Sequence, residues 1–214
     1  MNKIIYSLIF IVMMVAMAGC QEQQGSAKTE SKDKISQSKK LTQADKDELK
    51  NTITKKVSEY AKEQGLAVTN RYVSNGSYSE SDFYATTTDG EIQVIDNEKP
   101  GSKYFKLHNV TGLTVYTSKE DNIGLDDSAK QLSNIEGYKS VANMERPIKK
   151  YLFADNGKVY EYTFKDNSDT TLSSGFAYKD SNDKDPNLKP NVIFKETEND
   201  TIRQKWSDVL SKYD

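Results

Sequence analysis

The 214-residue sequence contains one cysteine, Cys20, and one histidine, His108. A lone cysteine cannot form a disulfide within the chain. A lone histidine excludes a multi-histidine metal site. A Ser-His-Asp triad could use only His108, and the sequence has no Gly-x-Ser-x-Gly nucleophile motif to meet it. His108 lies in a segment with strand-like alternation, so we expect a surface or hydrogen-bonded histidine in a strand.

Glycine-rich phosphate loops of the Gly-x-Gly-x-x-Gly or Gly-Lys-Ser type are also missing, which argues against nucleotide chemistry. The one oxygen-rich cluster, residues 180–187, alternates Asp183, Asp185 and Asn187 as a calcium loop does. It lacks the turn glycine and the closing glutamate of an EF-hand. We therefore expect no catalytic residue, no cofactor and no metal, and we expect that the protein is not an enzyme.

Acidic residues outnumber basic ones over most of the chain. The formal net charge is −2, and residues 21–40 hold five lysines against three acidic residues, so the chain from Leu41 onward is acidic. Nucleic acids and anionic membrane surfaces both select basic patches. We expect no nucleic-acid partner, and we expect a body that stands off from the membrane surface.

The first twenty residues have the parts of an export signal. Lys3 supplies a positive start, residues 4–17 are mostly apolar, and Ala18 and Gly19 are small residues before Cys20. A membrane span needs about 20 apolar residues, which this run does not reach. The segment is therefore predicted to be a cleaved signal.

The four residues Met17, Ala18, Gly19 and Cys20 resemble the lipobox of bacterial lipoproteins, which prefers leucine where Met17 stands. The resemblance implies that a diacylglycerol, carrying fatty acids such as palmitate, is attached to the Cys20 thiol and that cleavage occurs before Cys20. It implies a small lipoprotein of the Gram-positive type, anchored to the extracytoplasmic face of the cell membrane. An ordinary secretory signal with a coincidental cysteine is the alternative.

Three regions follow from this interpretation: a signal peptide at 1–19, a lipidated tether at 20–40 and a single domain at 41–214. The tether has too little apolar area to offset the entropy of ordering. As a flexible coil it would span about 25 Å.

Two amphipathic helices are predicted, one at each end of the domain. Thr42 and Asp45 have the spacing of a capping box before a helix at 43–64, which Gly65 ends. A second helix is predicted at 200–213, capped by Asn199 or Asp200. Trp206 lies in the middle of its apolar stripe, so we expect this helix to dock on a sheet through Trp206.

Alternating segments between the helices indicate strands, with turns at Asn75–Gly76, Asp89–Gly90, Pro100–Gly101 and Thr111–Gly112. The expected strands are residues 68–73, 78–87, 91–95, 104–109, 113–117, 171–178 and 191–195. The first half is expected to form an antiparallel meander. A short helix is expected near 128–135, and a helical turn at 140–146.

A hairpin is expected at 149–164 around a two-residue Asn156–Gly157 turn. This turn would pair Phe153 with Tyr160 and Tyr151 with Tyr162, placing the aromatic residues on one core face. The opposite face would be mixed and partly wet: Lys150, Leu152, Ala154, Val159, Glu161 and Thr163.

The predicted fold is α+β, an antiparallel sheet with an N-terminal and a C-terminal helix packed on it. Element order alone suggests folds of the cystatin or nuclear-transport-factor type. The expected function is a non-enzymatic binding or accessory module at the cell envelope. Its expected contacts are membrane lipid through Cys20 and an envelope protein, a wall polymer or a host molecule. The alternatives are a ligand-capturing lipoprotein of a transporter and an envelope-acting enzyme.

Overall fold

The computed structural model describes residues 41–73, 80–127, 135–164, 175–179 and 189–213. Several expectations lie outside these residues: the signal and lipobox at 1–20, the tether at 20–40, the Asn75–Gly76 turn, most of the helix at 128–135, residues 171–174 of one strand and the oxygen-rich cluster at 180–187.

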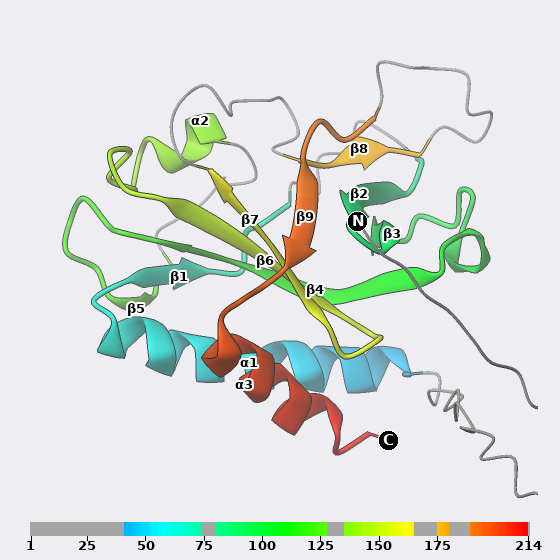
Figure 1. Cartoon of the computed structure of the whole chain (residues 1–214), viewed down its shortest axis with the longest axis horizontal. Helices are drawn as coiled ribbons and strands as arrows, with labels where there is room; N and C mark the ends of the chain where they lie inside the picture. Colours follow the sequence, from blue (N-terminus) through cyan, green and yellow to red (C-terminus); the bar gives the residue numbers. More distant parts are fainter. Residues whose placement is uncertain (1–40, 74–79, 128–134, 165–174, 180–188, 214) are drawn as a thin grey trace, which may run out of the picture. The chain divides into compact units, whose positions relative to one another are not determined.

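Along the described chain, the helix α1 (Gln43–Glu63) precedes the strands and the helix α3 (Asp200–Leu210) follows them (Figure 1). The helical elements are α1 (Gln43–Glu63), the 3₁₀ turn η1 (Ser102–Tyr104), α2 (Ile135–Tyr138) and α3 (Asp200–Leu210). The strands are β1 (Ala67–Thr69), β2 (Phe83–Thr87), β3 (Gly90–Ile95), β4 (Leu107–Tyr116), β5 (Gly124–Leu125), β6 (Ile148–Ala154), β7 (Val159–Phe164), β8 (Ala177–Tyr178) and β9 (Ile193–Glu196).

The predicted helix caps are confirmed. The Thr42 hydroxyl accepts a hydrogen bond from the Asp45 backbone N–H, and the Asp45 carboxylate accepts one from the Thr42 backbone N–H. Gly65, just past the C-terminus of α1, has a φ of 67°, where glycine carries no steric cost. Asn199 caps α3 by accepting a hydrogen bond from the Ile202 N–H.

The α+β class is confirmed, but the simple open antiparallel sheet is wrong. Six strands run in the order β3–β2–β9–β7–β6–β4, and β4 pairs back with β3 to close a barrel. The β2–β9 and β3–β4 pairs are parallel, so the first half is not an antiparallel meander. The cystatin or nuclear-transport-factor analogy rested on element order, and the same order here builds a closed barrel.

The two strands expected at 104–109 and 113–117 are one strand, β4. β4 is continuous through Thr111 and Gly112 and bonds to β3 near its start and to β1 near its end. Gly112 is needed for the close approach of an aromatic ring rather than for a turn, because a Cβ there would lie 2.3 Å from Cδ2 of Tyr72. The expected helical turn at 140–146 is also wrong, since α2 ends at Tyr138 and turns follow it.

The hairpin of β6 and β7 forms with a register one residue away from the expected one. Phe153 pairs with Val159, and Tyr151 pairs with Glu161. Gly157 has a φ of 82° and completes a three-residue loop instead of a two-residue turn. A one-residue slip turns every side chain of one strand to the opposite face.

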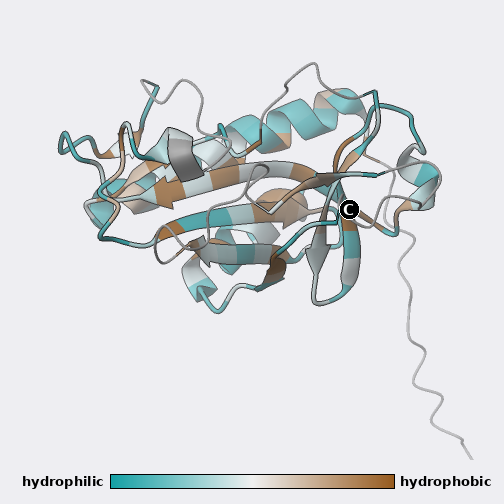
Figure 2. Cartoon of the chain, turned by 90° about the horizontal axis from the view of Figure 1, so that it is seen from above, coloured by the Kyte–Doolittle hydropathy of each residue, from teal (hydrophilic) through white to brown (hydrophobic). Residues whose placement is uncertain are grey.

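Two apolar clusters lie on opposite sides of the β6–β7 ladder. Tyr151 and Phe153 pack outward with residues of α1 and α3, and Tyr160 packs with Leu152 inside the barrel. The fully buried Trp206 packs its ring edge-on to Phe153, which confirms that α3 docks on the sheet through Trp206. Figure 2 shows hydrophobic residues along the strands, while the longest helix is mostly hydrophilic on the side in view.

Candidate functional site

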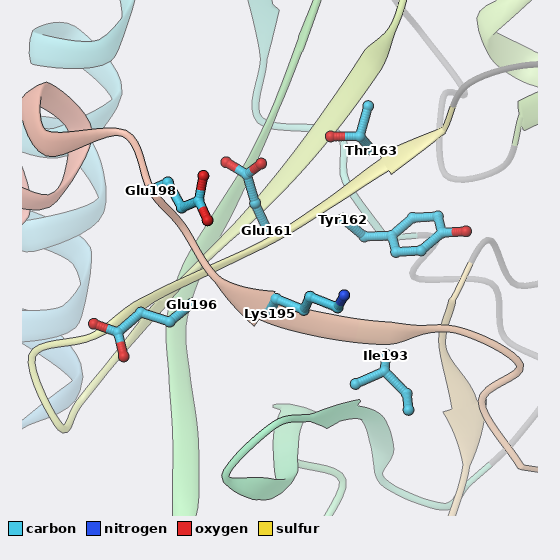
Figure 3. A pocket seen from close by; sticks show the side chains of 7 residues that line it. All are labelled: Glu161, Tyr162, Thr163, Ile193, Lys195, Glu196 and Glu198. Atoms are coloured by element: carbon cyan, nitrogen blue, oxygen red, sulfur yellow. The ribbon is translucent and has the colours of Figure 1, made fainter.

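The strands β7 and β9 are paired at one end and separate toward the other. They pair at Tyr160–Glu196 and Glu161–Lys195. β9 then pairs with β2 instead, through Ile193 and Phe194. Figure 3 shows the two ribbons crossing at the left and diverging to the right, with Tyr162 pointing between them.

A cavity of about 690 Å³ lies where the strands separate. We call it the β7–β9 groove, and its lining residues are Glu161, Tyr162, Thr163, Ile193, Lys195, Glu196 and Glu198. Its volume is within the range of about 300 to 1,000 Å³ that ligand sites occupy.

The edge of β7 in the groove is not paired by any residue that the structure describes. The Val159 carbonyl accepts a hydrogen bond from the Thr197 N–H across 2.9 Å, so Val159 directs its backbone groups toward β9. Alternate residues of a strand direct these groups to the same side, which places the N–H and C=O of Thr163 on the β9 side. The ladder stops at Lys195, and within the described ranges no residue is paired with Thr163 on that side.

Acidic side chains predominate along the groove. Glu161 contacts the Lys149 amine at 3.4 Å and accepts a hydrogen bond from the Thr197 hydroxyl. Lys158 is 3.0 Å from Glu196. Glu198 is exposed, and no hydrogen bond or ion pair joins it to another described residue.

The groove also has an apolar part. The Ile193 side chain is 53% exposed. The Tyr162 ring lies 4.8 Å from the ring of Phe164 and 5.9 Å from that of Phe194. The groove can therefore offer charged, apolar and backbone contacts to one ligand.

His108 is a hydrogen-bonded strand histidine, as predicted. Its Nδ1 lies 2.8 Å from the Asp155 carboxylate, and its Nε2 lies 2.9 Å from the Ser102 carbonyl. The hydrogen bond to Asp155 raises the pKa of His108. Both ring nitrogens are engaged by the fold, so His108 holds the start of β4 against the β6–β7 loop.

Lys150 is a buried lysine on the face of β6 that we expected to be partly wet. Its side chain lies inside the barrel with no exposed surface, and its nitrogen is within 6 Å of three aromatic ring centres. Those rings belong to Tyr138, Phe164 and Phe176. Burial lowers the pKa of Lys150 to about 7. The sequence signal for this burial is that Lys150 shares one strand face with three apolar residues, Ile148, Leu152 and Ala154.

The described residues contain no helix that is long and apolar enough to cross a membrane. Within the same part of the chain, no three His, Cys, Asp or Glu side chains are arranged to hold a metal ion. Comparison of the chain with known protein families, curated proteins and solved structures found no match.

Proposed function

We propose that this protein is a lipid-anchored, extracytoplasmic binding module that holds a partner in the β7–β9 groove and catalyses no reaction. The observation that carries the proposal is the groove itself, in which carboxylates, an exposed isoleucine and a strand edge that no described residue pairs line about 690 Å³. Pockets that combine apolar area with a few polar groups are the usual ligand sites of proteins. The partner is an envelope protein, a wall polymer or a host molecule.

The lipobox residues Met17–Cys20 support the anchoring part of the proposal. Two acyl chains on one thiol hold a protein stably at a membrane, whereas one chain does so only marginally. Cys20→Ala is therefore expected to move the protein from the detergent phase to the aqueous phase, or to leave the leader uncleaved. Mass spectrometry of the wild-type product should find diacylglycerol on an N-terminal Cys20, and a bare Cys20 would contradict the anchor.

The two other expected functions find less support. A ligand-capturing lipoprotein of a transporter would enclose its ligand between lobes, whereas this groove lies on the surface between two strands of one barrel. An envelope-acting enzyme built on His108 would need a free ring nitrogen, and Asp155 and Ser102 engage both of them.

Retention of the purified protein on isolated cell envelopes tests the groove. Ile193 and Ile123 are each 53% exposed, and only Ile193 lines the groove, so they form a matched pair. In a Cys20→Ala background, which removes anchoring by lipid, Ile193→Arg should lower retention severalfold. Ile123→Arg should leave retention unchanged. Equal retention of the two variants would refute the groove as the binding site.

A further inference from the structure

We infer that the occupant of the β7–β9 groove is an extended peptide segment of a partner protein, with a basic side chain, added as a strand to the edge of β7. The inference rests on the proposed function and specifies its ligand. It is argued from the backbone edge, the charges and the exposed apolar residue of the groove.

The backbone edge is the first argument. The N–H and C=O of Thr163 face the space that β9 leaves, and no described residue pairs with them on that side. Thr163 is only partly buried and lines the groove. Exposed strand edges are templates for pairing with another chain, and main-chain hydrogen bonds give affinity in this mode of recognition.

Among the described residues, the barrel does not close this edge of β7. Ile193 would be the next partner of Thr163 if the β7–β9 ladder continued beyond the Glu161–Lys195 pair. Ile193 is instead paired with Thr86 of β2, in a parallel ladder. Because β9 pairs with β2 here, the edge of β7 beyond Glu161 has no strand partner among the described residues.

The charges select the kind of peptide. Glu161, Glu196 and Glu198 line the groove with a single cation, Lys195. Lys158 already lies 3.0 Å from Glu196. Figure 3 labels Glu161 and Glu198 among the side chains that line the groove. Glu161 already contacts the Lys149 amine, whereas Glu198 has no hydrogen bond or ion pair with another described residue. A guanidinium or ammonium group on the ligand is the complement of the Glu198 carboxylate.

The exposed apolar residue selects a second side chain of the peptide. Ile193 lines the groove and is 53% exposed, and Figure 3 shows it on β9 at the side where β7 and β9 diverge. Side chains two positions apart on a strand point to the same face, about 7 Å from each other. A peptide that presents a basic residue and an apolar residue on one face therefore carries them two positions apart, with one residue between them.

The test uses the full-length lipidated protein in detergent and a fluorescent pentapeptide, Thr-Arg-Thr-Ile-Thr, blocked at both ends. Fluorescence anisotropy should show saturable binding. Ile193→Arg and Glu198→Lys should each weaken binding at least about tenfold, and Ile123→Arg should not change it. Glu198→Lys should also bind Thr-Glu-Thr-Ile-Thr better than the wild-type protein does.

A second peptide tests the strand geometry. N-methylation of the central threonine removes one backbone N–H and keeps every side chain, so it should abolish binding if the peptide adds as a strand. Equal affinity for the methylated peptide would overturn strand addition. Equal affinity of the wild-type protein for the Arg and Glu peptides would overturn the charge argument.

The envelope experiment separates this inference from the proposed function. If Ile193→Arg lowers retention on envelopes but no peptide binds, the groove remains the binding site and the peptide inference fails. If Ile193→Arg changes neither retention on envelopes nor peptide binding, the proposed function and the peptide inference both fail.

Discussion

The side-chain nitrogen of Lys150 donates a hydrogen bond to the backbone carbonyl of Tyr72 across 2.8 Å, inside the barrel. The contact joins β6 to the segment that follows β1. It places a titratable group where water does not reach it, and it makes the stability of the fold depend on pH.

The pKa of Lys150 is about 7 in the folded protein because of burial, against about 10.4 in an unfolded chain. Between these values the unfolded state binds more protons, so stability rises with pH. The contribution is on the order of 1 kcal/mol per pH unit. Lys150→Met should lack this rise. The free energy of unfolding of the wild type minus that of Lys150→Met, measured by urea unfolding, should therefore increase from pH 6 to pH 9. Lys195→Met controls for the loss of a positive charge, and parallel curves for wild type and Lys150→Met would contradict the prediction.

The pair of His108 and Asp155 should have the opposite dependence. The hydrogen bond to Asp155 raises the pKa of His108, so the stabilisation is complete below the unfolded value of about 6.5 and is lost as pH rises through the folded value. For a partly exposed pair the effect is below about 1 kcal/mol. His108→Gln should remove the decline, and Asp155→Asn should remove it as well. If stability still declines with rising pH in both variants, the His108–Asp155 pair is not the cause.

Trp206 is expected to be the most costly side chain of α3 to remove. It is fully buried, and its indole N–H donates to the Ala154 carbonyl across 3.0 Å. Trp206→Ala should lower the free energy of unfolding by about 3 to 5 kcal/mol. Trp206→Phe keeps a ring but removes one of the two donors to that carbonyl, since the Gly157 N–H also donates to it across 3.2 Å, and should cost about 1 kcal/mol. Denaturant titration measures both, and a loss below 1 kcal/mol for Trp206→Ala would contradict the docking of α3.

Gly112→Ala should destabilise the protein by about 1 to 3 kcal/mol, because the added methyl would overlap the Tyr72 ring. A double-mutant cycle isolates the contact. In a Tyr72→Ala background the same substitution should cost much less. An equal cost in both backgrounds would show that the ring is not responsible.

The helices were predictable because their signals are local. Thr42 with Asp45, and Asn199, mark the starts of α1 and α3 in a few adjacent residues. Barrel closure depends on the pairing of Ile92 with Leu107 between strands that also suit an antiparallel order, and no local pattern distinguishes the two.

The hairpin register and the groove escaped prediction for related reasons. The sequence around Gly157 is compatible with two-residue and three-residue loops, and the choice between them decides whether Lys150 faces water or the barrel interior. Thr163 and Ile193 have no special side-chain chemistry. Their importance comes from the point at which β9 leaves β7, which is a property of the whole barrel.

Hydrogen exchange on isolated cell envelopes tests the central claim most directly, because it reports the backbone amides of the groove in the bound protein. Exchange should slow at Thr163 when the protein is bound, while the exposed segment around Ile123 should exchange as in the free protein. Unchanged exchange at Thr163, with retention on the envelopes intact, would contradict the account.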